Sequence, residues 1–301
     1  MKHIFIINPA AGKTDIHMEL TKQINTYFAE HKGDYEILLT EYAGHAVKLA
    51  EQCCKGNDYC RIYAVGGDGT LNEVAQGAYK YDNCEIGIYP TGTGNDFIKS
   101  FDVEKERYKD IGALVNGNAV KCDLIKVNDR ISINVSSIGF DSEVARNVTR
   151  FKKLFSGNLP YTLSIAYCFL MKTKCALTIT VDDETPITGD FLFAVAANGR
   201  YYGGGYNPAP LAKTDDGLLD IVLIKAVSRP TILKLVEKYK KGTHLERTDI
   251  VTYKKAKKMT VEADRIIYNN IDGEVEATNK AEFEILPDSI KFILPSNINI
   301  E

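Results

Sequence analysis

The chain has 301 residues, of which 45% are hydrophobic and 26% are charged, proportions typical of a globular protein. Its 37 basic and 40 acidic residues leave a net charge of −3, so no global positive field indicates a nucleic-acid binder. The seven cysteines form no C-x-x-C pair, which argues against a zinc or disulfide framework and predicts reduced thiols in a cytoplasmic protein. Met1 leads directly into a predicted strand, so we expect no signal peptide, and the apolar stretch 159–171 is shorter than the roughly 20 residues of a membrane span.

The first half of the chain alternates predicted strands with predicted helices. Apolar runs and helical spacing of apolar residues indicate strands at 3–7, 35–40, 61–65 and 85–89, and helices at 16–28, 45–54 and 71–78. This alternation predicts a parallel sheet with helices on both faces. Ligands of such sheets bind at the carboxyl ends of the strands.

The loop after the first strand runs from Asn8 to Gly12 and precedes a helix. It continues as Gly12-Lys13-Thr14, like a P-loop, but the first glycine of that motif would fall at Ile7 inside the strand, so it is not a Walker A motif. Asn8 and the backbone up to Gly12 could hold phosphate at the helix start. A plain strand-to-helix turn is an equal alternative.

The turn from Gly66 to Thr70 joins the third strand to a helix, for which Thr70 is the expected N-cap. Three glycines in four positions allow backbone N–H groups to close on an anion at the helix N-terminus. The remaining side chain, Asp68, would be repelled by phosphates unless a divalent cation lay between them, so the turn indicates Mg-nucleotide. An ordinary strand-turn-helix connection is the alternative.

A second loop of small and polar residues, Pro90 to Phe97, follows the fourth strand and leads toward a possible helix. Two such loops on neighbouring strands are much less likely to be accidental than one. They strengthen the prediction of a phosphate site at this edge of the sheet.

From about Cys122 the pattern changes to mainly antiparallel strands, beginning with a hairpin about Asn128-Asp129. We therefore predict an α/β domain over 1–122 and a β domain over 123–294, with the tail 295–301 free to return to the first domain. The last strand could end in the second domain or return to the first. The predicted strands are 121–127, 130–136, 177–181, 191–197, 220–224, 259–263, 281–286 and 290–294, and the predicted helices are 142–150, 161–172 and 231–239.

Three stretches of the second half are candidate site segments. The glycine-rich stretch 198–205 suggests backbone packed against a ligand, or else a flexible surface loop. The acidic turn 213–218 is either a simple hairpin turn or a cation site in which Asp216 and neighbouring carbonyls bind. In the turn 270–274, Glu274 follows a glycine and could act as a general base, or lie in solvent.

Together these motifs resemble the diacylglycerol kinase catalytic-domain family, which includes bacterial lipid kinases and sphingosine and ceramide kinases. The resemblance covers nearly the whole chain with order and spacing maintained. It implies an N-terminal phosphofructokinase/NAD-kinase-like doubly wound nucleotide domain followed by a C-terminal β-sandwich. The motifs are Gly66 to Thr70 with Asn72 and Glu73, Pro90 to Phe97, Ser137 to Asp141, Asn198 to Gly205, Asp216 to Asp220, and Asp272 to Glu274.

The resemblance implies an ATP- and Mg2+-dependent lipid kinase with ATP in the cleft between the domains. Glu274 would be the base that accepts the proton of the lipid hydroxyl, with Asp68 as the rival for that role. Asp216, with backbone oxygens of Lys213 and Leu218, matches the family's structural Mg2+ site, and Asp68 and Asp96 would belong to the Mg2+-linked network. The implied nucleotide residues are Asn8, Pro9, Ala10, Ala11, Gly12, Thr40, Gly66, Gly67, Asp68, Gly69, Thr70, Leu71, Asn72, Thr93, Asn95 and Asp96.

The implied substrate is diacylglycerol or a similar lipid at a membrane surface, reached by peripheral association. A basic and apolar segment from Arg150 to Lys174 could dock there, although a buried helix with solvated ends explains the same residues. The basic cluster 254–258 is interpreted as an exposed edge strand. We expect no nucleic-acid partner, and a homodimer is compatible with the sequence. The alternative functions are a metabolite kinase of NAD-kinase type and a nucleotide-binding regulator without catalysis.

Overall fold

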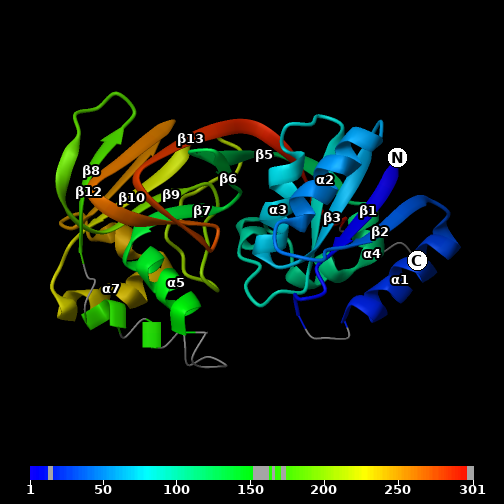
Figure 1. Ribbon diagram of the computed structural model, residues 1–301, viewed down its shortest axis with the longest axis horizontal. Helices are drawn as coiled ribbons and strands as arrows, with labels where there is room; N and C mark the ends of the chain where they lie inside the picture. Colours follow the sequence, from blue (N-terminus) through cyan, green and yellow to red (C-terminus); the bar gives the residue numbers. More distant parts are fainter. Residues whose placement is uncertain (13–15, 152–162, 165–166, 171–173, 297–301) are drawn as a thin grey trace. The chain divides into compact units, whose positions relative to one another are not determined.

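The computed structural model describes residues 1–12, 16–151, 163–164, 167–170 and 174–296 (Figure 1). The chain divides into two compact units. Unit 1 comprises Met1–Asp123 and the chain from Pro287 onward, and unit 2 comprises Leu124–Leu286. Residues 287–294, which the sequence pattern assigned to the second domain, thus lie in unit 1.

Unit 1 is built on a parallel sheet with the order β2-β1-β3-β4. Its central strands β1 and β3 are almost completely buried, which explains their apolar runs 4–7 and 62–65. The end of β13 adds a further parallel strand, because Phe292 pairs with Ile86 of β4. The strands are β1 (Lys2–Ile7), β2 (Asp34–Leu39), β3 (Cys60–Gly66), β4 (Cys84–Pro90) and the end of β13 (Glu274–Leu294).

Helices cover both faces of this sheet, with α2 and α3 on one face and α1 and α4 on the other (Figure 1). The prediction of Thr70 as N-cap is wrong: α3 begins at Asp68 and Gly67 is its N-cap, because the chain turns into the helix directly after the buried strand. The loop after β4 leads into a short 3-10 helix, η1. The helices are α1 (Ile16–His31), α2 (His45–Gly56), α3 (Asp68–Ala78), η1 (Phe97–Ser100), η2 (Lys105–Lys109) and α4 (Ile111–Val115).

Unit 2 is an antiparallel β domain, as the sequence predicted. In its sheet β11 is an edge strand next to β10, and β9, β7, β12 and β13 follow in order. The interpretation of the basic cluster is confirmed for Lys254 and Lys255 of β11, whereas Lys258 begins the interior strand β12. β8 pairs with both β9 and β12. The strands are β5 (Asn118–Val127, beginning in unit 1), β6 (Arg130–Ser132), β7 (Val135–Gly139), β8 (Cys175–Val181), β9 (Ile187–Ala197), β10 (Leu219–Lys225), β11 (Val251–Ala256) and β12 (Lys258–Ile271).

The strands of unit 2 bury residues on both faces. One cluster includes Ile179, Ile221 and Phe283. A second, between the sheet and helix α7, includes Val222 of the sheet and Leu235 and Tyr239 of α7. The helices are α5 (Phe140–Phe151), α7 (Arg229–Lys241) and η3 (His244–Glu246). Half of the predicted helix 161–172 lies outside the described residues, and its described parts, 163–164 and 167–170, are helical. Within the described part of the chain, no helix combines the length and the apolar character needed to cross a membrane.

The contact between α2 and α3 requires a glycine at position 77. A Cβ atom there would lie 2.2 Å from the carbonyl oxygen of Val47, which is backbone and cannot rotate away. Gly77→Ala should therefore lower the free energy of unfolding by about 1–3 kcal/mol, the usual cost of overpacking a core. Denaturant unfolding would measure this effect.

Gly56→Ala is the matched control, because Gly56 is also helical and a Cβ atom there meets nothing within 4 Å. It should leave stability unchanged or raise it by up to about 1 kcal/mol through helix propensity. Equal effects of the two substitutions would contradict the packing argument.

Candidate active site

The turn after β3 brings backbone N–H groups to the N-terminus of α3. Gly66 is the last residue of the buried strand, and a Cβ atom there would lie 2.2 Å from Oγ1 of Thr70. Asn8 at the end of β1 donates a hydrogen bond from Nδ2 to the same Oγ1 at 3.1 Å. The turn is therefore shaped by close contacts that leave no room for side chains at Gly66.

The two glycine-rich loops are held together by their backbones. The N–H groups of Thr91 and Gly92 both donate to the carbonyl oxygen of Gly66, at 2.9 and 3.2 Å. A Cβ atom on Gly92 would lie 2.6 Å from Cα of Gly67. The loop at the end of β4 thus packs directly on the turn at the end of β3, as the sequence predicted from their positions on neighbouring strands.

Asp68 links the same two loops through its side chain. Its Oδ1 accepts hydrogen bonds from the backbone N–H groups of Asp96 (2.7 Å) and Phe97 (3.2 Å). A Cβ atom on Gly94 would lie 3.1 Å from Oδ2 of Asp68 and 3.5 Å from Oδ2 of Asp96. The two carboxylates therefore face the same space beside Gly94.

Asn95 and Asp96 are buried in the second loop. Asn95 has a positive φ of 49°, and its Nδ2 donates to the carbonyl oxygen of Gly92 at 2.6 Å. Its Oδ1 is buried and has no hydrogen-bond partner among the described residues. Asp96 is 3% exposed, and its Oδ1 lies 2.5 Å from Nζ of Lys99.

The remaining predicted nucleotide residues of unit 1 lie at the same sheet edge. Oδ1 of Asn8 accepts from the N–H of Ala10, which shapes the first loop, and the N–H of Thr40 donates to the carbonyl of Ile7. Leu71 is completely buried, so its side chain belongs to the core and could not contact a ligand. Exposed residues among the predicted set are Pro9, Ala10, Gly12, Gly69 and Thr93.

Glu73 has a structural role that the sequence did not reveal. Its carboxylate accepts hydrogen bonds from the N–H groups of Gly44 (2.9 Å) and Ala46 (3.2 Å). It thereby satisfies donors at the N-terminus of α2, where a negative charge is favourable. In the Asn72-Glu73 pair that follows the glycine turn, Glu73 therefore holds the N-terminus of α2 against α3.

In unit 2, Asp272 organises the turn that carries Glu274. Its Oδ1 accepts from the hydroxyl of Ser132 and the N–H groups of Asn134 and Val135, and its Oδ2 accepts from the N–H of Ile133, at 2.7–3.1 Å. Glu274 itself is exposed and forms an ion pair with Arg130. Asp272 is therefore held by four hydrogen bonds within the protein, whereas the side chain of Glu274 is exposed.

Asn198 joins the glycine-rich stretch to the same region. It donates from Nδ2 to the carbonyl oxygen of Ile133 at 2.9 Å, and its N–H donates to the carbonyl of Asn134. Asn134 in turn donates to the carbonyl of Tyr201 at 2.7 Å. The stretch 198–205 is therefore packed against the loop between β6 and β7 and is not simply a free surface loop.

Asp216 at the predicted cation site forms an ion pair with Lys255. Nζ of Lys255 also lies 3.6 Å from Oδ2 of Asp220, which is completely buried and accepts a 2.6 Å hydrogen bond from the hydroxyl of Tyr253. Burial raises the pKa of the Asp220 carboxyl, against the opposing effects of Tyr253 and Lys255. The ammonium group of Lys255 therefore supplies positive charge to this acidic turn.

Asp141, in the Ser137 to Asp141 motif, is a polar group that sequence reasoning did not assign to the site. The hydroxyl of Ser137 donates to its Oδ2, while its buried Oδ1 has no hydrogen-bond partner among the described residues. Burial raises the pKa of this carboxyl. The sequence signal that could have identified Asp141 as a site residue was its place in the Ser137 to Asp141 motif, next to Gly139.

No cluster of three or more His, Cys, Asp or Glu side chains suited to a metal ion occurs among the described residues. Mg2+ needs fewer protein ligands, because it is commonly held by one or two carboxylates together with nucleotide phosphates. Asp68 and Asp96, which both face the space beside Gly94, fit that requirement. Asp96 and Asp216 are each paired with a lysine, Asp96 with Lys99 and Asp216 with Lys255.

Comparison with known families agrees with these motifs. Residues 2–127 match the diacylglycerol kinase catalytic domain, and residues 134–294 match the YegS C-terminal NAD kinase beta sandwich-like domain. The chain belongs to the diacylglycerol kinase catalytic-domain family, and its two-domain organisation is that of an α/β catalytic domain followed by a β-sandwich-like domain. The resemblance drawn from the sequence is confirmed.

Individual relatives are similar over most of the chain. The "putative lipid kinase YtlR" of Bacillus subtilis (strain 168) is 31% identical over 310 residues, which cover 97% of this chain and 99% of the relative. A "putative lipid kinase" of Staphylococcus aureus (strain MRSA252) is 26% identical over 267 residues, 87% of each chain. A crystal structure of a "putative diacylglycerol kinase" from Bacillus anthracis str. Sterne has a TM-score of 0.77 at 24% identity, covers 97% of this chain and 96% of its own, and shows the shared fold.

The hydrogen bonds of Asp272 predict a large effect of its removal. Asp272→Ala leaves three backbone N–H groups and one hydroxyl without their acceptor, so the free energy of unfolding should fall by about 2–4 kcal/mol. Asp183→Ala, at an exposed turn residue, is the control and should change stability by less than about 0.5 kcal/mol. Urea unfolding at neutral pH compares the two, and similar stabilities would show that Asp272 does not hold this turn.

Proposed function

We propose that this protein is an ATP- and Mg2+-dependent kinase that phosphorylates the free hydroxyl of diacylglycerol or a similar lipid. In this proposal unit 1 is a nucleotide domain of the phosphofructokinase and NAD-kinase type. The observation that carries it is the paired glycine loops, whose backbones meet at Gly66 and Gly92 while the carboxylates of Asp68 and Asp96 face one space. Such an arrangement supports binding of phosphate groups with a divalent cation.

The phosphates of ATP would bind to backbone N–H groups at the N-terminus of α3, where the helix dipole favours negative charge. Asp68 and Asp96 would hold Mg2+, which supplies charge neutralisation for the transferring phosphoryl group. Asp68 also fixes the second loop through the N–H groups of Asp96 and Phe97. Its role therefore combines positioning with charge, and phosphoryl transfer depends chiefly on these two effects.

Glu274 is the proposed general base. Its exposure leaves its carboxylate reachable by a substrate hydroxyl, and its ion pair with Arg130 holds it in a defined direction. Asp68 already uses Oδ1 to accept two backbone hydrogen bonds, which favours a positioning role for that residue. Glu274 would accept the lipid hydroxyl proton as the hydroxyl oxygen attacks the γ-phosphorus, and the bond from that phosphorus to the bridging oxygen would break to release ADP.

A lipid substrate requires contact with a membrane surface, for which unit 2 offers a basic cleft. We use this name for a cavity of about 180 Å3 whose lining includes three basic residues, Arg146, Lys174 and Arg265, one acidic residue, Glu143, which pairs with Arg146, and the apolar Ile266. The guanidinium of Arg146 lies 4.1 Å from the ring centre of Tyr268, and Ile266 is 59% exposed. Cationic side chains around an exposed apolar residue support docking on anionic lipids. The predicted docking residues 152–153 lie outside the described residues.

A metabolite kinase of NAD-kinase type would need the same phosphate loops, and it is the second candidate for that reason. The relatives named as lipid kinases favour the lipid reading. A nucleotide-binding regulator without catalysis is disfavoured by the retained carboxylates of Asp68, Asp96 and Glu274. Transfer of labelled phosphate distinguishes the three.

The decisive measurement is transfer of phosphate from γ-labelled ATP to diacylglycerol, monoacylglycerol, sphingosine, phosphatidylglycerol and NAD, with and without Mg2+. We expect labelled lipid in the presence of Mg2+ and almost none without it. Asp68→Asn keeps an oxygen that can accept the two N–H groups but removes the charge, so it should lower kcat about a hundredfold to ten-thousandfold. Glu274→Gln should lower kcat about a hundredfold or more.

Glu276→Gln, two residues farther along β13, is the matched control and should retain activity. Label on NAD alone would replace the lipid proposal with a metabolite kinase, and label on no acceptor would favour the regulator. Full activity of Asp68→Asn would contradict the mechanism.

Membrane docking by the basic cleft predicts binding to anionic vesicles that weakens as salt rises. Arg265→Glu should reduce vesicle binding by about fivefold to tenfold, because each basic residue near an anionic surface contributes about 1 kcal/mol and reversal adds repulsion. Lys121→Glu, at an exposed lysine of unit 1, serves as the control. Co-sedimentation with phosphatidylglycerol vesicles measures both, and binding insensitive to salt and to Arg265 would refute docking by this cleft.

A further inference from the structure

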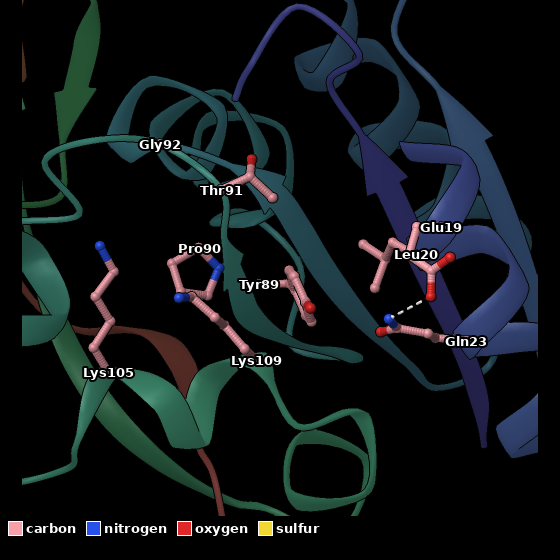
Figure 2. Close-up of a pocket in the computed structure, with 9 residues that line it drawn as sticks. All are labelled: Glu19, Leu20, Gln23, Tyr89, Pro90, Thr91, Gly92, Lys105 and Lys109. Carbon is pink, nitrogen blue, oxygen red and sulfur yellow. Dashed lines mark hydrogen bonds between the residues drawn. The ribbon is translucent and has the colours of Figure 1, made fainter. Parts of the chain in front are cut away.

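A second cavity lies wholly within unit 1, at the carboxyl end of β4 (Figure 2). Its volume is about 260 Å3. It is lined by Glu19, Leu20 and Gln23 of α1, by residues 89–92 at the end of β4, and by Lys105 and Lys109 of η2. The residues that the resemblance assigned to the nucleotide do not line it, whereas Pro90, Thr91 and Gly92 of the second glycine-rich loop form one of its walls.

The lysines give the cavity its chemistry. Figure 2 shows both side chains extending from η2 toward the Pro90 to Gly92 end of β4. Lys109 bonds to the carboxylate of Glu106 at 3.0 and 3.1 Å, whereas Lys105 has no carboxylate within 4 Å in the described part of the chain. Both are only partly exposed, so an anion held between them would be shielded in part from solvent.

The opposite wall adds hydrogen-bonding and apolar groups. Glu19 accepts a 3.0 Å hydrogen bond from Gln23, and burial raises the pKa of the Tyr89 hydroxyl, which therefore remains a donor at neutral pH. Leu20 and Pro90 are buried and apolar in character. Glu19 lines the cavity and Glu106 pairs with Lys109, so Lys105 is the ammonium group that no paired carboxylate offsets among the described residues. The lining combines it with groups suited to hydroxyls and a short carbon chain.

The cavity is mechanically connected to the phosphate loops. Its wall residues Thr91 and Gly92 donate their N–H groups to Gly66, and Gly92 packs on Gly67 with no side chain between them. The hydroxyl of Thr91 also lies 3.5 Å from the carbonyl oxygen of Ala11 in the first loop. A ligand that shifts Thr91 or Gly92 must therefore shift the turn that carries Asp68.

We propose that this cavity binds a small phosphomonoester, with its phosphate between Lys105 and Lys109, and that its occupancy is coupled to nucleotide binding at the neighbouring loops. The phosphomonoester is either a free metabolite or the headgroup of a phosphorylated lipid, since both present the same dianion. The proposed binding of the phosphomonoester is argued only from the residues that line the cavity. The coupling step also rests on the proposed nucleotide function of the glycine loops.

The direction of the coupling follows from charge. Lys105 and Lys109 contribute positive potential to the adjacent loops, over distances up to about a Debye length of 8–10 Å, and Glu106 and Glu19 offset part of it. A bound dianion cancels that potential, so nucleotide binding should weaken. By thermodynamic reciprocity, nucleotide must weaken the binding of the phosphomonoester by the same factor.

Binding is tested by phosphorus NMR and calorimetry on the full chain, with inorganic phosphate, glycerol 3-phosphate and vesicles containing phosphatidic acid as three separate probes. We expect at least one of them to bind, and Lys105→Gln with Lys109→Gln to weaken that binding about tenfold. Lys55→Gln is the matched control, because Lys55 is likewise paired to a glutamate within its own helix. Binding of the soluble probes assigns a free metabolite, and binding of the vesicles alone assigns a lipid headgroup.

Coupling is tested by the Kd of ADP with and without a saturating amount of the bound probe. We expect an increase of about fivefold in the Kd of ADP in the native protein and no increase in the double lysine variant. Failure of ADP to bind at all would count against the proposed function and leave the anion site to be judged by the first experiment. Binding of no probe, an unchanged affinity in the double variant, or complete displacement of the probe by ADP would overturn the proposed site.

Discussion

The structure of unit 1 depends on the direct contact between two backbone turns, in which Gly92 packs on Gly67 and the N–H groups of Thr91 and Gly92 share the carbonyl oxygen of Gly66. No side chain can be added at Gly92 without a clash, since its Cβ would approach Cα of Gly67 to 2.6 Å. This contact holds the turns that follow β3 and β4 directly against each other. Asp68 can then reach the N–H groups of Asp96 and Phe97, which orders the second loop.

In unit 2 a carboxylate, that of Asp272, holds two loops in a fixed arrangement. Asp272 accepts four hydrogen bonds from the loop between β6 and β7, so a single carboxylate replaces the backbone contact that glycine provides in unit 1. Its φ of 48° turns the chain sharply, which leads to Gly273 and the exposed Glu274. A reactive side chain on a rigid turn combines accessibility with a fixed direction, a combination that general-base chemistry requires.

Local signals in the sequence were sufficient for most elements. The strands of unit 1 were predicted within a few residues because each is a short apolar run between a helix and a loop. Thr70 was misjudged because its hydroxyl accepts from Asn8, 62 positions away, while the helix starts earlier. The sequence pattern predicted two separate strands, 281–286 and 290–294, but β13 is continuous through Pro287, and the N–H of Asp288 is satisfied by Oδ1 of Asp123.

Contacts between residues far apart in the sequence could not be predicted from the sequence pattern. The pairing of Asp216 with Lys255 follows from the antiparallel register of β10 and β11, in which Asp220 lies opposite Lys255. The lysine cluster indicated an exposed edge strand, and Lys255 is exposed, but the sequence pattern did not predict the register that pairs it with Asp216. The bonds from Asp68 to the second loop were likewise hidden, because they join residues 28 and 29 positions apart.

Charge balance distinguishes the two acidic regions that sequence reasoning grouped together. Phosphates bound beside Asp68 and Asp96 would add negative charge to two carboxylates that face one space, so a divalent cation there has an electrostatic reason to bind with the nucleotide. At Asp216 the ammonium group of Lys255 already meets that requirement and is shared with the buried Asp220. A cation at the site formed by Lys213, Asp216 and Leu218 has to share or displace this ion pair, and repulsion from Lys255 opposes it. Lys99 is paired with Asp96 as Lys255 is with Asp216, so in the proposed function it is the nucleotide phosphates that would distinguish the first site from the second.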